Sequence, residues 1–145
     1  MSLNGIYDPE NIFAKIIAGN IPSAKVYEDD DILSFMDAFP QTPGHTLVIP
    51  KTASRNLFDT KPEVLANVIQ KTQLIAQAVK MAFEPDGIVI TQFNGAPAGQ
   101  TVFHLHFHIL PRYTSSAMSA HASGKMADMN ELTEQAAKIQ AALKR

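Results

Sequence analysis

The chain has 145 residues, of which 46% are apolar and 18% charged, with a formal net charge of −2. This length is enough to bury a core within one domain, and the composition excludes a disordered protein. The small net charge and the lack of a basic run argue against a nucleic-acid or membrane-surface partner, since both require clustered Lys and Arg.

The chain contains no cysteine, which excludes a disulfide framework and a thiolate zinc site. No apolar stretch approaches the roughly 20 residues that a membrane-spanning helix needs. The first residues, 1–5, lack a basic segment followed by an apolar run, so no secretory signal is expected. These features lead us to expect a cytoplasmic protein without a membrane partner.

The first half of the chain predicts one helix and three strands. Asp8 is expected to cap a helix whose apolar residues fall at helical spacing between Ile12 and Ile17, and Gly19 ends it. Strands are expected at 24–28, 32–37 and 46–49, the first two joined by an acidic turn.

The second half predicts a long helix, two strands and a final helix. Thr60 and Glu63 resemble a capping box that opens a helix reaching about Phe83. A buried strand is expected at 88–93, a loop at 94–99 and a last strand at 102–110. Residues 113–126 are polar and rich in Ser and Ala, which predicts a flexible loop before the helix that starts near 128–131. Short antiparallel strands with helices on one face give the α+β class.

Three of the five histidines, His104, His106 and His108, occupy alternate positions in one short run. Because side chains alternate along a strand, the three imidazoles are expected on one face, with the apolar residues between them facing the core. Burying three imidazoles for structure alone would be costly, since each then needs a polar partner.

Three interpretations of the histidines remain open at this point. The first is a solvated polar strand face. The second is a metal site using His104, His106 and perhaps His45, although three alternate residues on one strand are nearly collinear and one ion cannot easily collect all of them. The third is nucleophilic attack on phosphorus by a neutral imidazole, with its neighbours orienting it and moving protons.

The loop at 94–101 favours the third interpretation. Its glycines let the backbone approach a ligand and expose N–H groups, which can form a concavity for an anion. Gln100 and Thr101 add neutral donors. Beside three imidazoles, this loop is expected to hold a phosphate.

The run from Ala98 to Arg112 resembles the signature of the histidine triad (HIT) family, His-φ-His-φ-His-φ-φ, where φ is apolar. Residues 12–17 resemble the opening helix of that family, and the segments 35–37 and 43–51 resemble its second and third strands. The resemblance covers nearly the whole chain.

This resemblance implies a HIT-like fold: a five-stranded antiparallel sheet with a long central helix, a short N-terminal helix and a C-terminal helix. It implies one HIT domain over residues 1–145, with a core at about 8–112, the loop at 113–126 and the final helix at 127–145. It also implies a homodimer, and a purine nucleotide such as an AMP conjugate as the ligand.

The resemblance also assigns site residues. His106 matches the nucleophile, which attacks the α-phosphate to form a covalent nucleotidyl-histidine, and His104, His108 and His45 match the histidines that support it. Asp37 matches the carboxylate that accepts the ribose hydroxyls. The phosphate side is matched by Asn94, Gly99, Gln100 and Thr101, and the base pocket by Ile12, Phe13, Ile16 and Phe35.

The chain departs from part of the family pattern. Some members carry a Cys-x-x-Cys pair in the opening helix and a His after the third strand, and bind structural zinc there. This chain has Asn11, Ala14 and Ala53 at those positions. We therefore expect no metal and no cofactor.

The expected function is hydrolysis at the α-phosphate of a purine nucleotide conjugate, such as a phosphoramidate, an aminoacyl-adenylate or a dinucleoside polyphosphate. Two alternatives are carried with it. One is a nucleotide sensor that binds without turnover, and the other is a metallohydrolase with histidine ligands.

Overall fold

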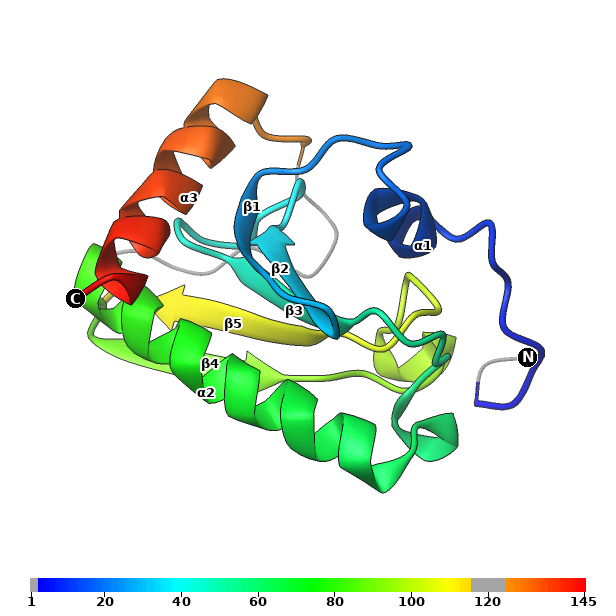
Figure 1. Cartoon of the computed structure of the whole chain (residues 1–145). Helices are drawn as coiled ribbons and strands as arrows, with labels where there is room; N and C mark the ends of the chain where they lie inside the picture. The colour runs from blue at the N-terminus through cyan, green and yellow to red at the C-terminus, as the bar shows by residue number, and fades with distance from the viewer. Residues whose placement is uncertain (1–2, 116–124) are drawn as a thin grey trace.

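The computed structural model describes residues 3–115 and 125–145. Its elements follow in the order α1 (Ile12–Ile17), β1 (Lys25–Glu28), β2 (Ile32–Met36), β3 (Thr46–Pro50), η1 (Leu57–Asp59), α2 (Pro62–Phe83), β4 (Gly87–Thr91), η2 (Ala96–Ala98), β5 (Phe107–Arg112) and α3 (Met129–Leu143). Figure 1 shows the sheet with α1 lying apart from the two longer helices.

The five strands form one sheet in the order β1-β2-β3-β5-β4, and every neighbouring pair is antiparallel. The expected α+β fold with a five-stranded antiparallel sheet is therefore confirmed. β5 lies between β3 and β4 in the sheet. The end of the histidine run is therefore beside β3, the strand that begins directly after His45.

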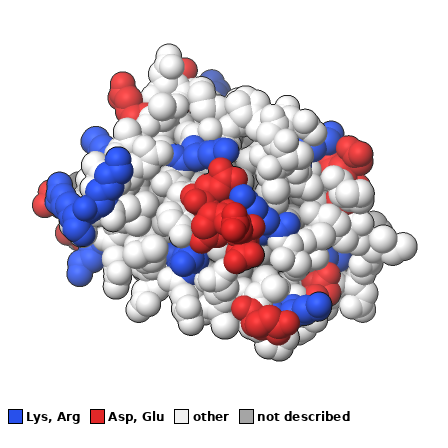
Figure 2. Space-filling view, in the orientation of Figure 1, with Lys and Arg blue, Asp and Glu red and all other residues white. Residues whose placement is uncertain are grey.

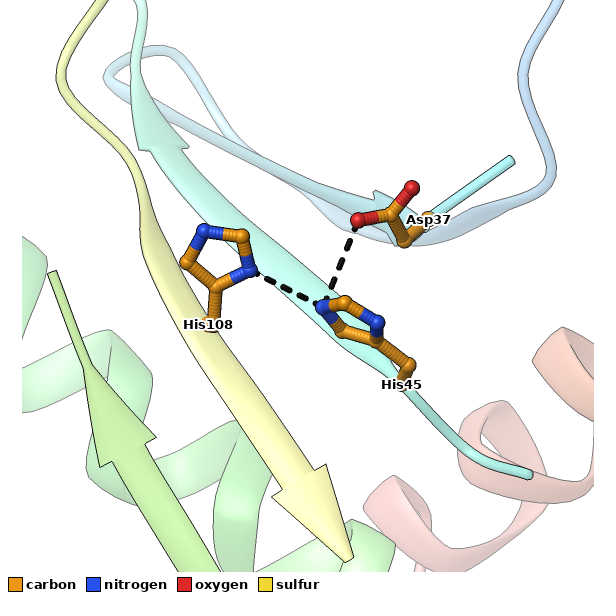
Figure 3. A group of neighbouring side chains, drawn as sticks. All are labelled: Asp37, His45 and His108. Atoms are coloured by element: carbon orange, nitrogen blue, oxygen red, sulfur yellow. Dashed lines mark hydrogen bonds and ion pairs between the residues drawn. The ribbon is translucent and has the colours of Figure 1, made fainter. Parts of the chain in front are cut away.

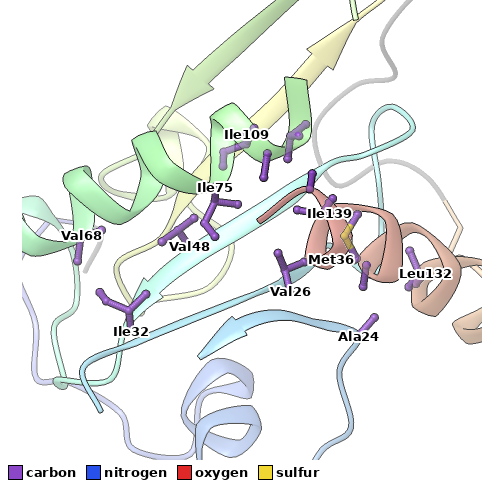
Figure 4. Packing of buried hydrophobic residues seen from close by; sticks show 14 residues of the cluster. Ala24, Val26, Ile32, Met36, Val48, Val68, Ile75, Ile109, Leu132 and Ile139 are labelled. Atoms are coloured by element: carbon purple, nitrogen blue, oxygen red, sulfur yellow. The ribbon is translucent and has the colours of Figure 1, made fainter. Parts of the chain in front are cut away.

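The two faces of the sheet are both covered. On one face Val48 and Ile109 pack with Ile75 of α2 and Ile139 of α3, in the larger apolar cluster (Figure 4). On the other face Phe13 of α1 packs in a smaller cluster with the intervening strand residues Leu33, Phe35, Leu47 and Ile49. All five residues of β2 and of β3 are buried as a result. The helices thus cover both faces, whereas the sequence predicted one.

Two predicted helix starts are wrong. The cap of α1 is Asn11, whose side-chain oxygen accepts from Ala14 N–H at 2.9 Å, because the chain becomes helical only after Asp8 has closed a separate turn. The cap of α2 is Lys61, which forms no side-chain cap bond, while the hydroxyl of Thr60 donates to the carbonyl of Asn56. A capping box does occur one element earlier, around η1.

Two predicted strands also differ. The strand expected to be buried at 88–93 is β4, an edge strand with one open side, and Ile90 is 43% exposed. The strand expected at 102–110 begins only at Phe107. Residues 101–106 are irregular because Leu105 N–H donates to Ser54 C=O at 2.8 Å instead of joining the ladder.

No helix in the described part of the chain is long and apolar enough to cross a membrane. On the face drawn in Figure 2, acidic and basic side chains are interspersed. The flexible loop expected at 113–126 falls mostly on residues 116–124, which lie outside the described residues.

Candidate active site

The three histidines of the run are all buried, with exposed fractions of 0% for His104, 5% for His106 and 1% for His108. The expected alternation still brings two of their rings together, since the centroids of His106 and His108 lie 4.9 Å apart. Only His108 belongs to β5; the other two precede it. The run is therefore an enclosed polar row, not a solvated strand face.

His106 has its proton placed by the backbone. Its Nδ1 lies 2.6 Å from the carbonyl oxygen of His104, and a carbonyl can only accept, so Nδ1 carries the hydrogen. In the neutral ring the lone pair is then on Nε2. Phe13 of α1 packs edge-on against the same ring at 4.9 Å, which helps to fix its orientation.

The proton of His45 is placed in the same way. Its Nδ1 accepts from the backbone N–H of Gln41 at 3.1 Å, so the hydrogen of the neutral ring is on Nε2. That nitrogen lies 2.9 Å from Nδ1 of His108 and 3.3 Å from Oδ2 of Asp37 (Figure 3). His45 therefore donates to both. His108 accepts at Nδ1, which leaves its own hydrogen on Nε2.

The Asp37–His45 contact is a hydrogen bond from a neutral imidazole rather than an ion pair. Adding a proton to Nδ1 of His45 would set it against the N–H of Gln41. Burial raises the pKa of the Asp37 carboxyl to about 6, and the bond from Phe39 N–H opposes this only in part.

Asp37, His45 and His108 are also the one group in the described residues with three potential metal-ligand atoms within 4.8 Å of one another. A histidine that binds a metal normally donates its other N–H to an oxygen. Here the other nitrogen of His45 accepts, so its Nε2 carries hydrogen where a metal would need a lone pair. The chemistry of the set fits a hydrogen-bond chain better than a metal site.

His104 is held on both nitrogens. Nε2 lies 2.7 Å from the carbonyl oxygen of Pro50, and Nδ1 lies 2.7 Å from the hydroxyl of Tyr7. Burial lowers the pKa of this histidine, and the bond to Pro50 opposes that shift. Both nitrogens face protein groups, so the ring does not join His106 and His45 around a single point.

A cavity of about 320 Å³ lies beside the histidine row. Eight of the predicted site residues line it: Ile12, Phe13, Ile16, Phe35, Asp37, Thr101, His106 and His108. The sequence missed further lining residues, including Phe39, which lies in the loop after β2, and Met129 and Leu132 of α3. The helical spacing of Leu132 indicated only core packing.

The other loop residues predicted for the phosphate side, Asn94, Gly99 and Gln100, do not line the cavity. The side chain of Gln100 accepts from Gly95 N–H and donates to the carbonyls of Arg55 and Val102, so its amide is used within the loop. The Asn94 oxygen accepts from Leu57 N–H. Gly99 adopts a φ of +112°, which favours glycine, and ends the short helix η2. These three residues therefore fix the shape of the loop.

The HIT domain family matches residues 18–115 of the chain. The chain belongs to the HIT family. It is 51% identical over 102 residues to "Protein hit" of Bacillus subtilis, covering 70% of each chain. The crystal structure of a Hit-like protein from Bartonella henselae, described as involved in cell-cycle regulation and holding an unknown ligand, superposes with a TM-score of 0.89 at 53% identity, over 95% of this chain and 99% of that one.

Two other HIT relatives carry functional names. The adenylylsulfatase HINT3 of Arabidopsis thaliana is 41% identical over 112 residues, which cover 77% of this chain and 57% of that protein. A hypothetical histidine triad nucleotide-binding protein of Sulfolobus tokodaii has a TM-score of 0.84 at 28% identity, with 91% of each chain covered. The HIT family thus includes nucleotide-binding proteins and a nucleotide hydrolase.

Proposed function

We propose that this HIT protein hydrolyses a purine nucleotide conjugate at its α-phosphate through a covalent intermediate on His106. The observation that carries the proposal is the 2.6 Å bond from His106 Nδ1–H to the His104 carbonyl, beside the cavity. It leaves the lone pair of a neutral imidazole on Nε2, which is the form that attacks phosphorus.

The apolar part of the cavity is suited to the nucleoside. Ile12, Phe13, Ile16 and Phe35 offer flat apolar surface for a base. Asp37 follows the end of β2 and lines the same cavity, so its carboxylate can accept both ribose hydroxyls. The adenylylsulfatase and nucleotide-binding relatives support a nucleotide in this place.

The phosphate would then lie between Thr101 and His108, which line the cavity next to His106. The hydrogen that His45 forces onto Nε2 of His108 makes that ring a donor toward a phosphate oxygen. Preorganised donors of this kind stabilise the charge that develops during phosphoryl transfer.

The reaction proceeds in two displacements. The Nε2 lone pair of His106 forms a bond to phosphorus as the bond to the leaving nitrogen or oxygen breaks, and the leaving group departs with a proton taken from solvent. Water then attacks the nucleotidyl-histidine and the P–N bond breaks. The water releases a proton to solvent, and the products are a nucleoside monophosphate and the free neutral imidazole. No metal and no cofactor is required by these steps.

A homodimer is part of the proposal. β4 is an edge strand, and Ile69 of α2 and Ile90 of β4 are 48% and 43% exposed beside a cavity of about 530 Å³ on this face. A second copy of the chain would cover these residues and pair the open edge. A monomeric mass in light scattering at micromolar concentration would contradict it.

The test compares wild type with His106→Ala on adenosine 5′-phosphoramidate, a diadenosine polyphosphate and adenylyl sulfate, each with EDTA present. We expect wild type to release AMP and the variant to release none while still binding AMP. Release by the variant at the wild-type rate would overturn the nucleophile. Activity that EDTA abolishes and Zn²⁺ restores would favour a metallohydrolase, and binding without release by wild type would favour a sensor.

A further inference from the structure

Tyr7 contacts the histidine run, although neither the motif nor the cavity lining includes it. It lies in the segment that precedes α1, 97 residues away from His104 in sequence, yet its hydroxyl is 2.7 Å from His104 Nδ1. The two rings meet edge to face, with centroids 5.7 Å apart. The contact therefore joins the start of the chain to the histidine run.

The direction of this bond follows from the other nitrogen of His104. Because Nε2 faces the Pro50 carbonyl, it must carry hydrogen, and the neutral ring then accepts at Nδ1. Tyr7 is consequently the donor. Burial lowers the pKa of His104 and raises the pKa of Tyr7, and both shifts keep this arrangement uncharged.

His104, whose ring is held by Tyr7 and Pro50, also contacts the proposed nucleophile, His106. The carbonyl of His104 is the group that fixes Nδ1–H of His106. Pro50 and Tyr7 together immobilise the residue that supplies that carbonyl. This part of the chain has no strand ladder to do so, because β5 begins only at Phe107.

The segment that carries Tyr7 is anchored at two more points. The amide of Asn56 donates to Leu3 C=O at 2.8 Å. Gly5 lies against the guanidinium of Arg55, where an added Cβ would be 3.1 Å from Cζ, and that guanidinium stacks on the ring of Phe103 at 4.3 Å. Phe103 immediately precedes His104. The opening segment therefore supports the histidine run at two places, through Arg55 at Phe103 and through Tyr7 at His104.

We propose that Tyr7 is a positioning residue for the nucleophile: its hydroxyl holds His104, whose carbonyl orients His106 for attack. This inference rests on the proposed function for its kinetic consequence. Tyr7 itself does not line the cavity, so it acts on the rate and not on nucleotide affinity.

The kinetic test uses Tyr7→Phe, which removes the hydroxyl and keeps the ring. We expect kcat to fall about tenfold, with KM within about twofold of wild type. Tyr27→Phe is the control, since it also removes a tyrosine hydroxyl that donates a hydrogen bond, to Asp29 at 2.8 Å, and we expect its kcat to be unchanged. A wild-type kcat in Tyr7→Phe, or a loss that equals its loss of folded protein, would overturn the proposal.

A second measurement needs no substrate. In nitrogen-15 spectra of the histidine rings, Tyr7→Phe should shift Nδ1 of His104, which loses its donor, and also the resonances of His106. Tyr27→Phe should shift neither. Unmoved His106 resonances in folded Tyr7→Phe would overturn the proposal whatever the chain hydrolyses. Inactive wild type with shifted His106 resonances would instead reject the proposed function and keep the link between Tyr7 and His106.

Discussion

The two histidines that flank His106 have the same place in the repeating motif but opposite surroundings. His104 has one nitrogen on the Pro50 carbonyl and the other on the Tyr7 hydroxyl, so both of its nitrogens face protein groups. His108 accepts a hydrogen bond from His45 at Nδ1, and its ring lines the cavity. Both rings carry their hydrogen on Nε2, but in His104 that N–H is used by the Pro50 carbonyl, whereas His108 lines the cavity. A regular motif therefore does not give its members equal roles.

Of the two flanking histidines, His108→Ala should have the larger effect on rate. It removes the proposed donor to the phosphate and the Nδ1 acceptor of His45 Nε2–H. Loss of one preorganised donor typically lowers kcat by about 10²–10³-fold, while binding of AMP should change little. Single-turnover kinetics and equilibrium binding check this. A kcat near wild type would remove the distinction between the two flanking histidines.

His104→Ala should lower stability, in addition to the loss of rate expected when His106 is no longer positioned. The ring is fully buried, and its removal leaves a cavity together with a buried Pro50 carbonyl and Tyr7 hydroxyl that lack their partner. We expect the free energy of unfolding to fall by about 3 kcal/mol, measured by urea denaturation. An unchanged midpoint of unfolding would show that the enclosed ring is not structural.

Asp37→Asn should raise stability while it weakens nucleotide binding. Burial lifts the pKa of this carboxyl from 3.8 to about 6, so the folded state binds the proton more tightly than the unfolded state. The contribution of Asp37 to the stability of the wild-type protein is therefore fully present below pH 4. It is lost as pH rises through 6. At pH 7 the variant should be more stable by about 2 kcal/mol.

The difference between the Asp37 variant and wild type should shrink to nothing as pH is lowered to 4. Denaturation with urea at several pH values between 4 and 8 measures it. If wild type were the more stable protein at pH 7, a cation would have to compensate the carboxylate, and the assignment of His45 as neutral would be wrong.

The sequence predicted the order of the elements and the row of histidines because both depend on local periodicity. It did not predict where β5 begins, because Leu105 N–H is taken by Ser54, a residue that no periodicity links to it. Gln100 was expected to serve a phosphate from its chemistry and from the family resemblance, yet its amide is occupied by backbone groups.

Tyr7 carried no signal that could have identified it. A single tyrosine before a helix is ordinary, and its partner is 97 residues away in sequence. The cavity wall from α3 was missed for a similar reason, since Leu132 fits the helical spacing of core residues. Local patterns thus pointed to the residues proposed to react, whereas the residues that support them depend on tertiary contacts.

The place of β5 in the sheet has a consequence for biosynthesis. β4 pairs with β5 and with no other described strand, and β5 is made after it. As the chain leaves the ribosome, strand β4 therefore has no pairing strand until the segment that carries the histidines has been made. The bonds from Tyr7, Pro50 and His45 form only when that last strand inserts, so a partly synthesised chain has no oriented His106. Completion of the sheet and orientation of His106 therefore occur in one event.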